Sequence, residues 1–361
     1  MDTDFQAQLQ AAGATFITPS EPDVVESFGN DSAAIAAATS GVALYDRTHW
    51  GRVQVSDGDR LRFLHNQSTN DFERRSSGQG CDTVFVTSTA RTIDLVSAYV
   101  LNDAVLLLTS PGMGDRLLNW MDRFIFFADK VKLDLITDST AAMSVIGPAS
   151  TDCLSTLVSD VASLKELSQQ PYGSHREFII QDVPVRVAVG SGLATEGYTL
   201  ITDAENHSKL WQAIKAAGAI PMGETAWEHL RITQGRPMPE HELTDDYNPL
   251  EAGLWNTVSF EKGCYIGQET IARLDTYNGV KQQLWGIQLN QAADPGTVIT
   301  EGDNKIGRLT SVIQTDDGLL GLAYIRTKAG GAGLTVTVGE AAGQVVDVPF
   351  PTRSRVSQSS E

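Results

Sequence analysis

The C-terminal part of the chain constrains the fold most, because it reads as short strands separated by turn sequences. The turns are Asp294-Pro295-Gly296, Gly302-Asp303-Asn304 and Asp316-Asp317-Gly318. Around them lie five apolar, strand-like runs, at 284–289, 305–312, 319–324, 334–338 and 344–348. Short strands at this spacing predict a small β-barrel. We therefore expect a C-terminal barrel domain over residues 280–361 and a separate region over residues 1–279.

The region before the barrel alternates strand and helix patterns without a regular βαβ repeat, which predicts an α+β fold. Strands are predicted at 51–55, 83–87, 93–101, 105–109, 131–136, 176–180 and 185–189, and helices around 61–64, 117–124, 205–217 and 223–234. Residues 1–30 are predicted to be irregular, and an alanine-rich helix after them ends at Gly41. Neither GxGxxG nor a P-loop occurs at a strand-to-helix junction, so a dinucleotide-binding fold is not indicated.

Composition excludes several classes of function. The 361 residues carry 27 basic and 45 acidic side chains, a formal net charge of −18. This charge argues against direct nucleic-acid binding and against an anionic membrane surface. No apolar run approaches a membrane span, and the N-terminus resembles no signal peptide, so we expect a cytoplasmic protein. The three cysteines are widely spaced without a CxxC, which predicts neither a metal site nor disulfides and favours a reducing compartment.

The sequence KGCYIGQE, Lys262 to Glu269, surrounds one of these cysteines with glycines. Gly263 and Gly267 let the backbone turn sharply beside Cys264. A lysine two residues before a thiol favours the thiolate, which is the reactive and metal-binding form. Helical spacing begins at Ile266, so Cys264 is predicted just before a helix N-terminus, whose dipole has the same effect. A turn that carries a small buried cysteine fits the residues equally well.

With Arg273, this stretch resembles the signature of the YgfZ family, folate-binding relatives of the aminomethyltransferase (T-protein) of the glycine cleavage system. The family pattern is Lys-Gly-Cys, an aromatic residue, any residue, Gly-Gln-Glu, and an Arg a few residues later. The matching residues are Lys262, Gly263, Cys264, Tyr265, Gly267, Gln268, Glu269 and Arg273. The resemblance implies that Cys264 and Lys262 are catalytic. It also implies that Tyr265, Gln268 and Arg273 contact a tetrahydrofolate or a derivative.

The resemblance covers the chain from about Gly41 onward. Gly41 to Asp71 resembles the start of the aminomethyltransferase-like fold, and KIGRLTSV and LLGLAYIR resemble its C-terminal barrel. The implied fold is α+β: two interleaved α/β subdomains that bind folate, plus the β-barrel, arranged as a ring. His49 and His65 lie in the first stretch. Neither has metal-ligand spacing to a partner, so we interpret both as structural or exposed.

Asp94 and Leu95, in a predicted strand, correspond to an acidic pair of the T-protein family. The pterin ring offers a donor edge that a carboxylate accepts in two hydrogen bonds, and the glutamate tail suits Arg or Lys. The resemblance assigns Asp94 to the catalytic group, but Leu95 replaces the second acid of the T-protein pair. T-protein chemistry relies on an aspartate to orient the reacting amine, so this departure disfavours aminomethyl transfer. The alternative for Asp94 is a solvated strand residue.

A second departure falls on the glutamate that faces the pterin in the family, which corresponds to Thr199 in Glu196-Gly197-Tyr198-Thr199. A hydroxyl in place of the carboxylate loses roughly 1.5–3 kcal/mol of pterin affinity. Glu196 is the candidate replacement, with Tyr198 beside it, although positions 196 and 199 face opposite sides of a regular strand.

Two further folate contacts follow from the resemblance. Arg231 corresponds to the helix arginine of the family, and its alternatives are a surface cation or an ion pair with Glu228. Trp255, in the segment before the signature, is expected to line the pocket.

Two functions from different classes follow from these residues. The first is a folate-binding accessory protein for assembly or repair of iron–sulfur clusters in client enzymes, including tRNA-modifying ones, as the YgfZ resemblance implies. Clusters take about four ligands, so one cysteine predicts no permanent cluster in this chain. The second is a tetrahydrofolate-dependent one-carbon enzyme, an aminomethyltransferase of the T-protein type. A scaffold that binds a partner through its barrel is a third, weaker reading.

Overall fold

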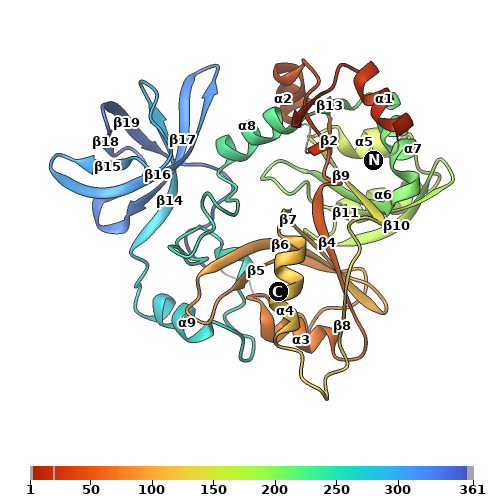
Figure 1. Ribbon diagram of the computed structural model, residues 1–361, viewed down its shortest axis with the longest axis horizontal. Helices are drawn as coiled ribbons and strands as arrows, with labels where there is room; N and C mark the ends of the chain where they lie inside the picture. Colours follow the sequence, from red (N-terminus) through yellow and green to blue (C-terminus); the bar gives the residue numbers. More distant parts are fainter. Residues whose placement is uncertain (1–2, 19–20, 356–361) are drawn as a thin grey trace. The chain divides into compact units, whose positions relative to one another are not determined.

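The computed structural model describes residues 3–18 and 21–355, and the chain divides into two compact units (Figure 1). The first unit comprises Met1–Leu61, Arg74–Cys81 and Ser97–Glu228. The second comprises Arg62–Glu73, Asp82–Val96 and His229–Glu361. Each unit joins segments that are distant in sequence. The boundary at residue 279 stays a prediction for where the barrel domain begins.

A six-stranded sheet forms the centre of the first unit, in the order β10-β11-β12-β9-β3-β13. Its strands are β3 (Ala43–Asp46), β9 (Thr140–Ile146), β10 (His175–Ile180), β11 (Val183–Val189), β12 (Gly197–Asp203) and β13 (Ile220–Met222). Only the β3–β13 pair among these is parallel. The helices of this unit include α5 (Ser150–Ser155), α6 (Val161–Ser168) and α7 (His207–Ala216), the last preceded by the 3₁₀ turn η1 (Ala204–Asn206). The predicted 176–180/185–189 hairpin is confirmed as β10 and β11.

The N-terminal segment departs from the prediction of an irregular lead-in. It forms helix α1 (Thr3–Ala11), the antiparallel pair β1 (Thr15–Thr18) and β2 (Glu21–Ser27), and helix α2 (Asp31–Ser40). Phe5 and Leu9 lie on one face of α1 and are buried in the core of this unit. The ring of Phe5 packs edge-on against Trp211 of α7, with 5.7 Å between centroids. This tertiary burial stabilises a nine-residue helix that would be marginal alone. Pro19, which favoured the irregular reading, lies outside the described residues.

A second sheet has the order β5-β6-β7-β4-β8. Its strands are β4 (Trp50–Ser56), β5 (Gly80–Val86), β6 (Thr92–Val100), β7 (Ala104–Pro111) and β8 (Lys132–Leu135), and helices α3 (Arg60–Gln67) and α4 (Gly114–Asp122) belong to the same part of the sequence. Strands β5 and β6 each contain residues of both units. The β6–β7 hairpin turns at Asn102 and Asp103, as the sequence predicts.

The predicted C-terminal barrel is confirmed, with six strands instead of five (Figure 1, blue). The strands are β14 (Gln282–Leu289), β15 (Val298–Glu301), β16 (Asn304–Thr315), β17 (Gly318–Arg326), β18 (Thr335–Val338) and β19 (Ala341–Val346). Strand β14 pairs with both β17 and β19, which closes the sheet and leaves no free edge. The sequence missed β15 because this strand has four residues and buries only Ile299.

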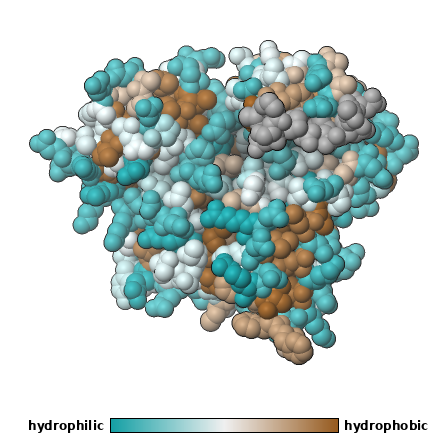
Figure 2. Space-filling view, in the orientation of Figure 1, coloured by the Kyte–Doolittle hydropathy of each residue, from teal (hydrophilic) through white to brown (hydrophobic). Residues whose placement is uncertain are grey.

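Outside its barrel, the second unit holds most of helix α8 (Glu224–Gln234) and all of helix α9 (Gln268–Thr276), with the 3₁₀ turns η2 (Trp255–Thr257) and η3 (Thr327–Ala329). The rings of Tyr247 and Tyr324 stack in its core, with centroids 3.5 Å apart. Hydrophilic residues are spread widely over the face that Figure 2 shows. Among the described residues, none of the helices is long and apolar enough to span a bilayer.

Candidate functional site

The KGCYIGQE loop is anchored by its lysine. Lys262 is buried, and its ammonium group donates to the backbone carbonyl oxygens of His65, Ser68 (2.6 Å) and Asn70 (2.7 Å). His65 lies in the last turn of α3, where helical carbonyls lack intrahelical partners, and Ser68 and Asn70 follow the end of this helix. The ammonium also lies 4.5 Å from the centre of the Tyr265 ring. A further backbone bond, from Ile266 N to Asn66 O (3.0 Å), fixes the loop against the same segment.

This arrangement changes the interpretation of Lys262. The sequence suggested a cation placed to stabilise the thiolate of Cys264. In the structure, the three donors of the ammonium are matched by three carbonyl oxygens. The contacts therefore describe an anchor for the loop, and a catalytic role for Lys262 stays a prediction without direct support from them.

Cys264 is exposed, whereas Cys81 and Cys153 are buried. Burial raises the pKa of the Cys153 thiol, which makes that thiol less reactive. The predicted helix is confirmed as α9, and Gly267, with φ of 81°, is its N-cap. Cys264 lies three residues before this cap, at the margin of the range over which a helix dipole acts. The alternative of a small buried cysteine is therefore wrong, because the thiol lies on the protein surface.

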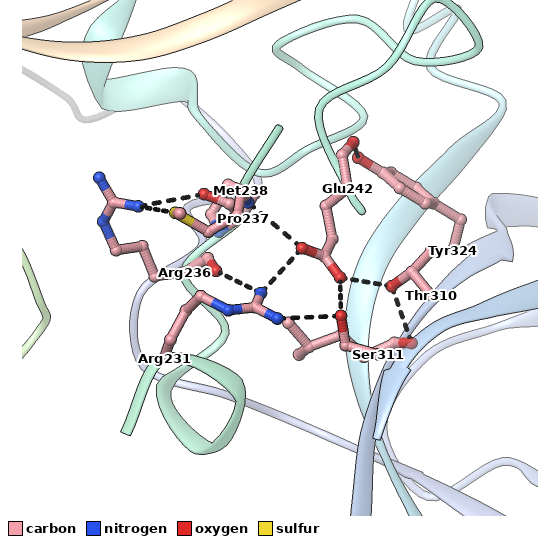
Figure 3. Close-up of polar contacts among 9 residues, drawn as sticks. Arg231, Arg236, Pro237, Met238, Glu242, Thr310, Ser311 and Tyr324 are labelled. Atoms are coloured by element: carbon pink, nitrogen blue, oxygen red, sulfur yellow. Dashed lines mark hydrogen bonds and ion pairs between the residues drawn. The ribbon is translucent and has the colours of Figure 1, made fainter. Parts of the chain in front are cut away.

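Arg231 occupies an interior site instead of a ligand-facing one (Figure 3). Its guanidinium group donates to Glu242 (2.9 Å) and to the hydroxyl of Ser311 (3.0 Å), and neither charged side chain is exposed. Glu242 also accepts hydrogen bonds from Thr310 (2.7 Å) and Ser311 (2.6 Å). Arg231 is fully buried, so the alternative of a surface cation is wrong. The guanidinium is directed into the protein, so the contacts do not support its binding a folate tail.

The strand residues of the proposed folate site are also interior. Asp94 and Leu95 are both buried in β6, so Asp94 is not the solvated residue that the sequence allowed. Thr199 is 1% exposed and donates its hydroxyl hydrogen to the carbonyl of Gly190 (2.8 Å). The hydroxyl oxygen keeps lone pairs that can accept a hydrogen bond, but almost none of the side chain is exposed, so burial leaves Thr199 poorly suited to replace a pterin-binding carboxylate.

Glu196 and Tyr198 do line one pocket in the first unit, with a volume of about 250 Å³. Glu196 precedes β12 and is exposed, so the strand argument that set it opposite Thr199 does not apply. The Tyr198 hydroxyl pairs with that of Thr151 (2.7 Å), and burial raises the Tyr198 pKa. This pocket is the place in the described structure where two of the predicted folate contacts meet.

A second, larger pocket of about 660 Å³ lies in the same unit. Tyr172 lines both this pocket and the one that contains Glu196 and Tyr198. Arg75, Arg176 and Arg186 line it, an unusual concentration of positive charge in a protein of net charge −18. Two of these guanidinium groups form ion pairs, Arg176 with Glu166 (3.2 Å) and Arg186 with Glu177 (3.4 Å). This pocket could not be predicted from the sequence, because Arg75 lies about 100 residues before Arg176 and Arg186.

The other residues predicted to contact folate are Trp255, Tyr265, Gln268 and Arg273. Trp255 is half-buried and donates its indole hydrogen to Leu250 O (3.1 Å). Tyr265 is buried beside Lys262, and Gln268 begins α9. Arg273 is exposed and pairs with Glu269 (3.4 Å) one helical turn away. No cluster of His, Cys, Asp and Glu with metal-binding geometry occurs within residues 3–18 and 21–355.

A buried titratable cluster near His49 escaped the sequence analysis. The Tyr45 hydroxyl donates to Glu224, and Nε2 of His49 lies 3.3 Å from the same carboxylate. Burial raises the pKa of Glu224 to about 7 and lowers that of His49 to about 4. Beside them Asp46 pairs with His207 (2.8 Å), and although burial acts to raise the pKa of Asp46, the charge and hydrogen bond of His207 lower it to about 2.

The comparisons with known proteins identify the class. The GCVT N-terminal domain matches residues 5–262, well over half of the chain. The protein therefore belongs to the GCVT-domain family, whose members resemble aminomethyltransferases. Its fold agrees: aminomethyltransferase T of the glycine cleavage system from Bartonella henselae superposes with a TM-score of 0.81 over 97% of both chains, at 17% identity. The predicted aminomethyltransferase-like fold is confirmed.

Several proteins of known name are similar to this chain in sequence. The chloroplastic protein At1g60990 of Arabidopsis thaliana, named provisionally as a transferase, is 46% identical over 98% of this chain and 81% of its own length. The aminomethyltransferase of Symbiobacterium thermophilum is 28% identical over 87% of both chains. Another aminomethyltransferase, from Bacillus subtilis, is 27% identical over 84% of both chains.

Proposed function

We propose that this protein is a YgfZ-type member of the GCVT-domain family. In this role it binds tetrahydrofolate or a derivative and assists assembly or repair of iron–sulfur clusters in client enzymes, including tRNA-modifying ones. The observation that carries the proposal is the exposed Cys264 on a loop that Lys262 fixes through three carbonyl oxygens. Such a loop presents a thiol at the surface in a defined backbone conformation. This arrangement suits a reaction between the thiol and a partner protein.

The surroundings of Asp94 favour this role over aminomethyl transfer. Leu95 is an apolar core residue where the T-protein pair has its second acid, so the pair keeps only Asp94. Thr199, at the position of the family's pterin-facing glutamate, is a buried hydroxyl in place of a carboxylate. Both departures disfavour aminomethyl transfer. The tetrahydrofolate-dependent aminomethyltransferase remains the second candidate, because the relatives from Symbiobacterium thermophilum and Bacillus subtilis carry the name aminomethyltransferase.

Folate binding is the part of the proposal that the family supports best. Glu196 and Tyr198 line one pocket, in which a carboxylate and an aromatic ring are available to a pterin. The direct test is titration of the purified chain with tetrahydrofolate and 5-formyltetrahydrofolate, for wild type and for Glu196→Gln. Micromolar binding that weakens at least tenfold in Glu196→Gln supports this pocket. Unchanged binding moves the folate site elsewhere, and no binding at millimolar ligand rejects the folate part.

The cluster role is tested in cells that lack the protein. Wild type is expected to restore the activity of iron–sulfur enzymes, and Cys264→Ala is expected to fail although it folds. Full rescue by Cys264→Ala rejects a role for the thiol and favours a scaffold. Tetrahydrofolate-dependent release of ammonia from an aminomethyl donor would instead establish the transferase. The cytoplasmic location is part of this proposal, and the comparison with the Arabidopsis relative, named as chloroplastic, leaves it untested.

A further inference from the structure

The 660 Å³ pocket of the first unit lies where the segment Arg74–Cys81 meets the edge strand β10. The backbone amide of His175 in β10 donates to the carbonyl oxygen of Gly78 (2.8 Å). Gly80 and Gly173 approach so closely that a Cβ on Gly173 would lie 2.5 Å from the backbone of Gly80. Glycine at these two positions therefore allows two segments that are far apart in sequence to form one pocket.

Three arginines from different parts of the first unit line this pocket, which we call the arginine pocket. Arg75 comes from the segment before β5, Arg176 from β10 and Arg186 from β11. The guanidinium of Arg75 donates to the carbonyl oxygen of Gly80 (2.9 Å), which holds this side chain where the two segments meet. Among the residues that line the pocket, Glu166 is the acidic one. Three positive charges thus stand against one negative charge.

A histidine positions Arg186 without adding to this charge. Nη1 of Arg186 lies 3.1 Å from Nδ1 of His175, and because a guanidinium only donates, Nδ1 is the acceptor. Burial and the nearby charge of Arg186 lower the pKa of His175 to about 4, so the ring is neutral near pH 7. The pocket therefore keeps two net positive charges at neutral pH.

The carboxylates that pair with two of these arginines are exposed to solvent. The Glu166 side chain, which pairs with Arg176, is 63% exposed, and that of Glu177, which pairs with Arg186, is 58% exposed. Exposed ion pairs are weak, because water solvates both partners. Each guanidinium has five N–H donors, so both groups are available to an anion that enters the pocket.

The arginine pocket is distinct from the pocket of Glu196 and Tyr198. Tyr172 lines both pockets, but the three arginines line only the larger one. The ring of Tyr172 lies over Gly190, where a Cβ would be 2.2 Å from Cε2 of the ring. Ligand binding by the arginines therefore does not depend on where folate binds.

We propose that the arginine pocket binds the phosphate group of a small metabolite. Guanidinium groups present paired N–H donors that match two oxygens of a phosphate. A phosphate monoester is mostly a dianion near neutral pH, which matches the two net positive charges of the lining. The volume of about 660 Å³ is that of a small-molecule site, and the net charge of −18 disfavours a nucleic acid as the source of the phosphate. This site goes beyond the proposed function, because it gives the protein a second ligand besides folate.

Titration calorimetry of the full chain with inorganic phosphate, at neutral pH and low ionic strength, tests this proposal. We expect wild type to bind with a Kd below about 1 mM, and Arg186→Gln to weaken binding about tenfold or more. Arg176→Gln is expected to weaken binding about threefold to tenfold, since its side chain is 46% exposed. Glu166→Gln removes the competing carboxylate and is expected to tighten binding about threefold. Arg116→Gln, which removes the same charge from an exposed position on α4 of the same unit, is the control and is expected to match wild type.

Hydrogen exchange locates the bound phosphate, and we expect it to slow backbone exchange at residues 75–80 and 173–177. The exposed Arg176 keeps the test decisive if Arg186→Gln does not fold, which circular dichroism establishes. Equal weakening by Arg176→Gln and Arg116→Gln would mean that only the general charge of the protein attracts phosphate, and it would overturn the proposal. Absence of binding at about 10 mM phosphate would also overturn it, since specific small-ligand sites bind more tightly. Citrate is titrated in parallel, and tighter binding of this tricarboxylate than of phosphate would show that the assignment to phosphate is wrong.

Discussion

Arg231 of α8 and Glu242 form an ion pair of 2.9 Å in which neither side chain is exposed. A register shift in β16 between Leu309 and Ser311 lets consecutive residues, Thr310 and Ser311, both donate to Glu242. Figure 3 shows the carboxylate enclosed by these donors. The pair thus ties a helix to the barrel within the second unit.

Replacing Arg231 by alanine is expected to destabilise the protein by about 3–5 kcal/mol, because it leaves Glu242 charged and buried without its counter-ion. The free energy of unfolding is measured by urea denaturation with circular dichroism. Arg273→Ala removes the exposed pair with Glu269 and is the matched control, with little expected change. Equal stability of the two variants would show that solvent reaches the interior pair.

Lys262→Met is expected to lower the free energy of unfolding by about 2–4 kcal/mol, because three buried carbonyl oxygens lose their donor. Backbone amides at 263–266 are expected to exchange hydrogen faster as the loop loses its anchor. Cys264→Ala is the control, since the side chain is exposed and its removal leaves the anchor intact. Unchanged exchange in Lys262→Met would refute the anchoring role.

Glu224→Gln is expected to make stability less dependent on pH. The folded-state pKa of Glu224 is raised from 4.5 to about 7, so the native state binds more protons than the unfolded state between these values, and stability from this group falls as pH rises through 7. At pH 5 the native states of both proteins carry a neutral side chain at position 224, so the difference in stability between them should be smallest there. At pH 8 the variant should be more stable by about 2 kcal/mol, a value reduced because 23% of the Glu224 side chain is exposed.

His49 acts in the opposite direction and must be separated from this effect. Its pKa is lowered from 6.5 to about 4, so its contribution to stability rises with pH between these values. Urea denaturation at pH 5, 6.5 and 8 for wild type, Glu224→Gln and His49→Gln resolves the two groups. A constant stability difference between wild type and Glu224→Gln at all three pH values would contradict the raised pKa.

Gly267→Ala is expected to destabilise the native state by about 2–3 kcal/mol. Its φ of 81° disfavours any L side chain, and a Cβ there would lie 2.9 Å from the carbonyl oxygen of Thr87. Gly296→Ala is the matched control, because Gly296 has a φ of 91° with no atom within 4 Å of a Cβ. The Gly296→Ala control is expected to lower the free energy of unfolding by only about 1 kcal/mol. Thermal unfolding of both variants measures this difference. Equal destabilisation by the two substitutions would mean that the backbone near Thr87 moves to make room for the new Cβ.

Much of the architecture was predictable because it depends on local patterns. The turn sequences around Asp294 and Asp316 mark the barrel, and Asn102-Asp103 marks a hairpin, since turn residues impose their geometry without help from distant residues. Helix α1 was missed because its stability comes from Phe5 packing on Trp211, a contact across about 200 residues that no local pattern contains.

The sequence by itself determined the KGCYIGQE signature and the barrel, whereas the tertiary structure showed that Cys264 is the exposed cysteine. Only the tertiary structure decided what the charged residues around it do. Lys262, predicted to be catalytic, donates to backbone carbonyl oxygens, and Arg231, predicted to bind folate, donates to Glu242. His65, interpreted as structural or exposed, is buried and lies 3.1 Å from Asp71, which agrees with the structural alternative. The physical reason is that a buried charge must find partners wherever the fold brings them, and spacing along the chain does not record those partners.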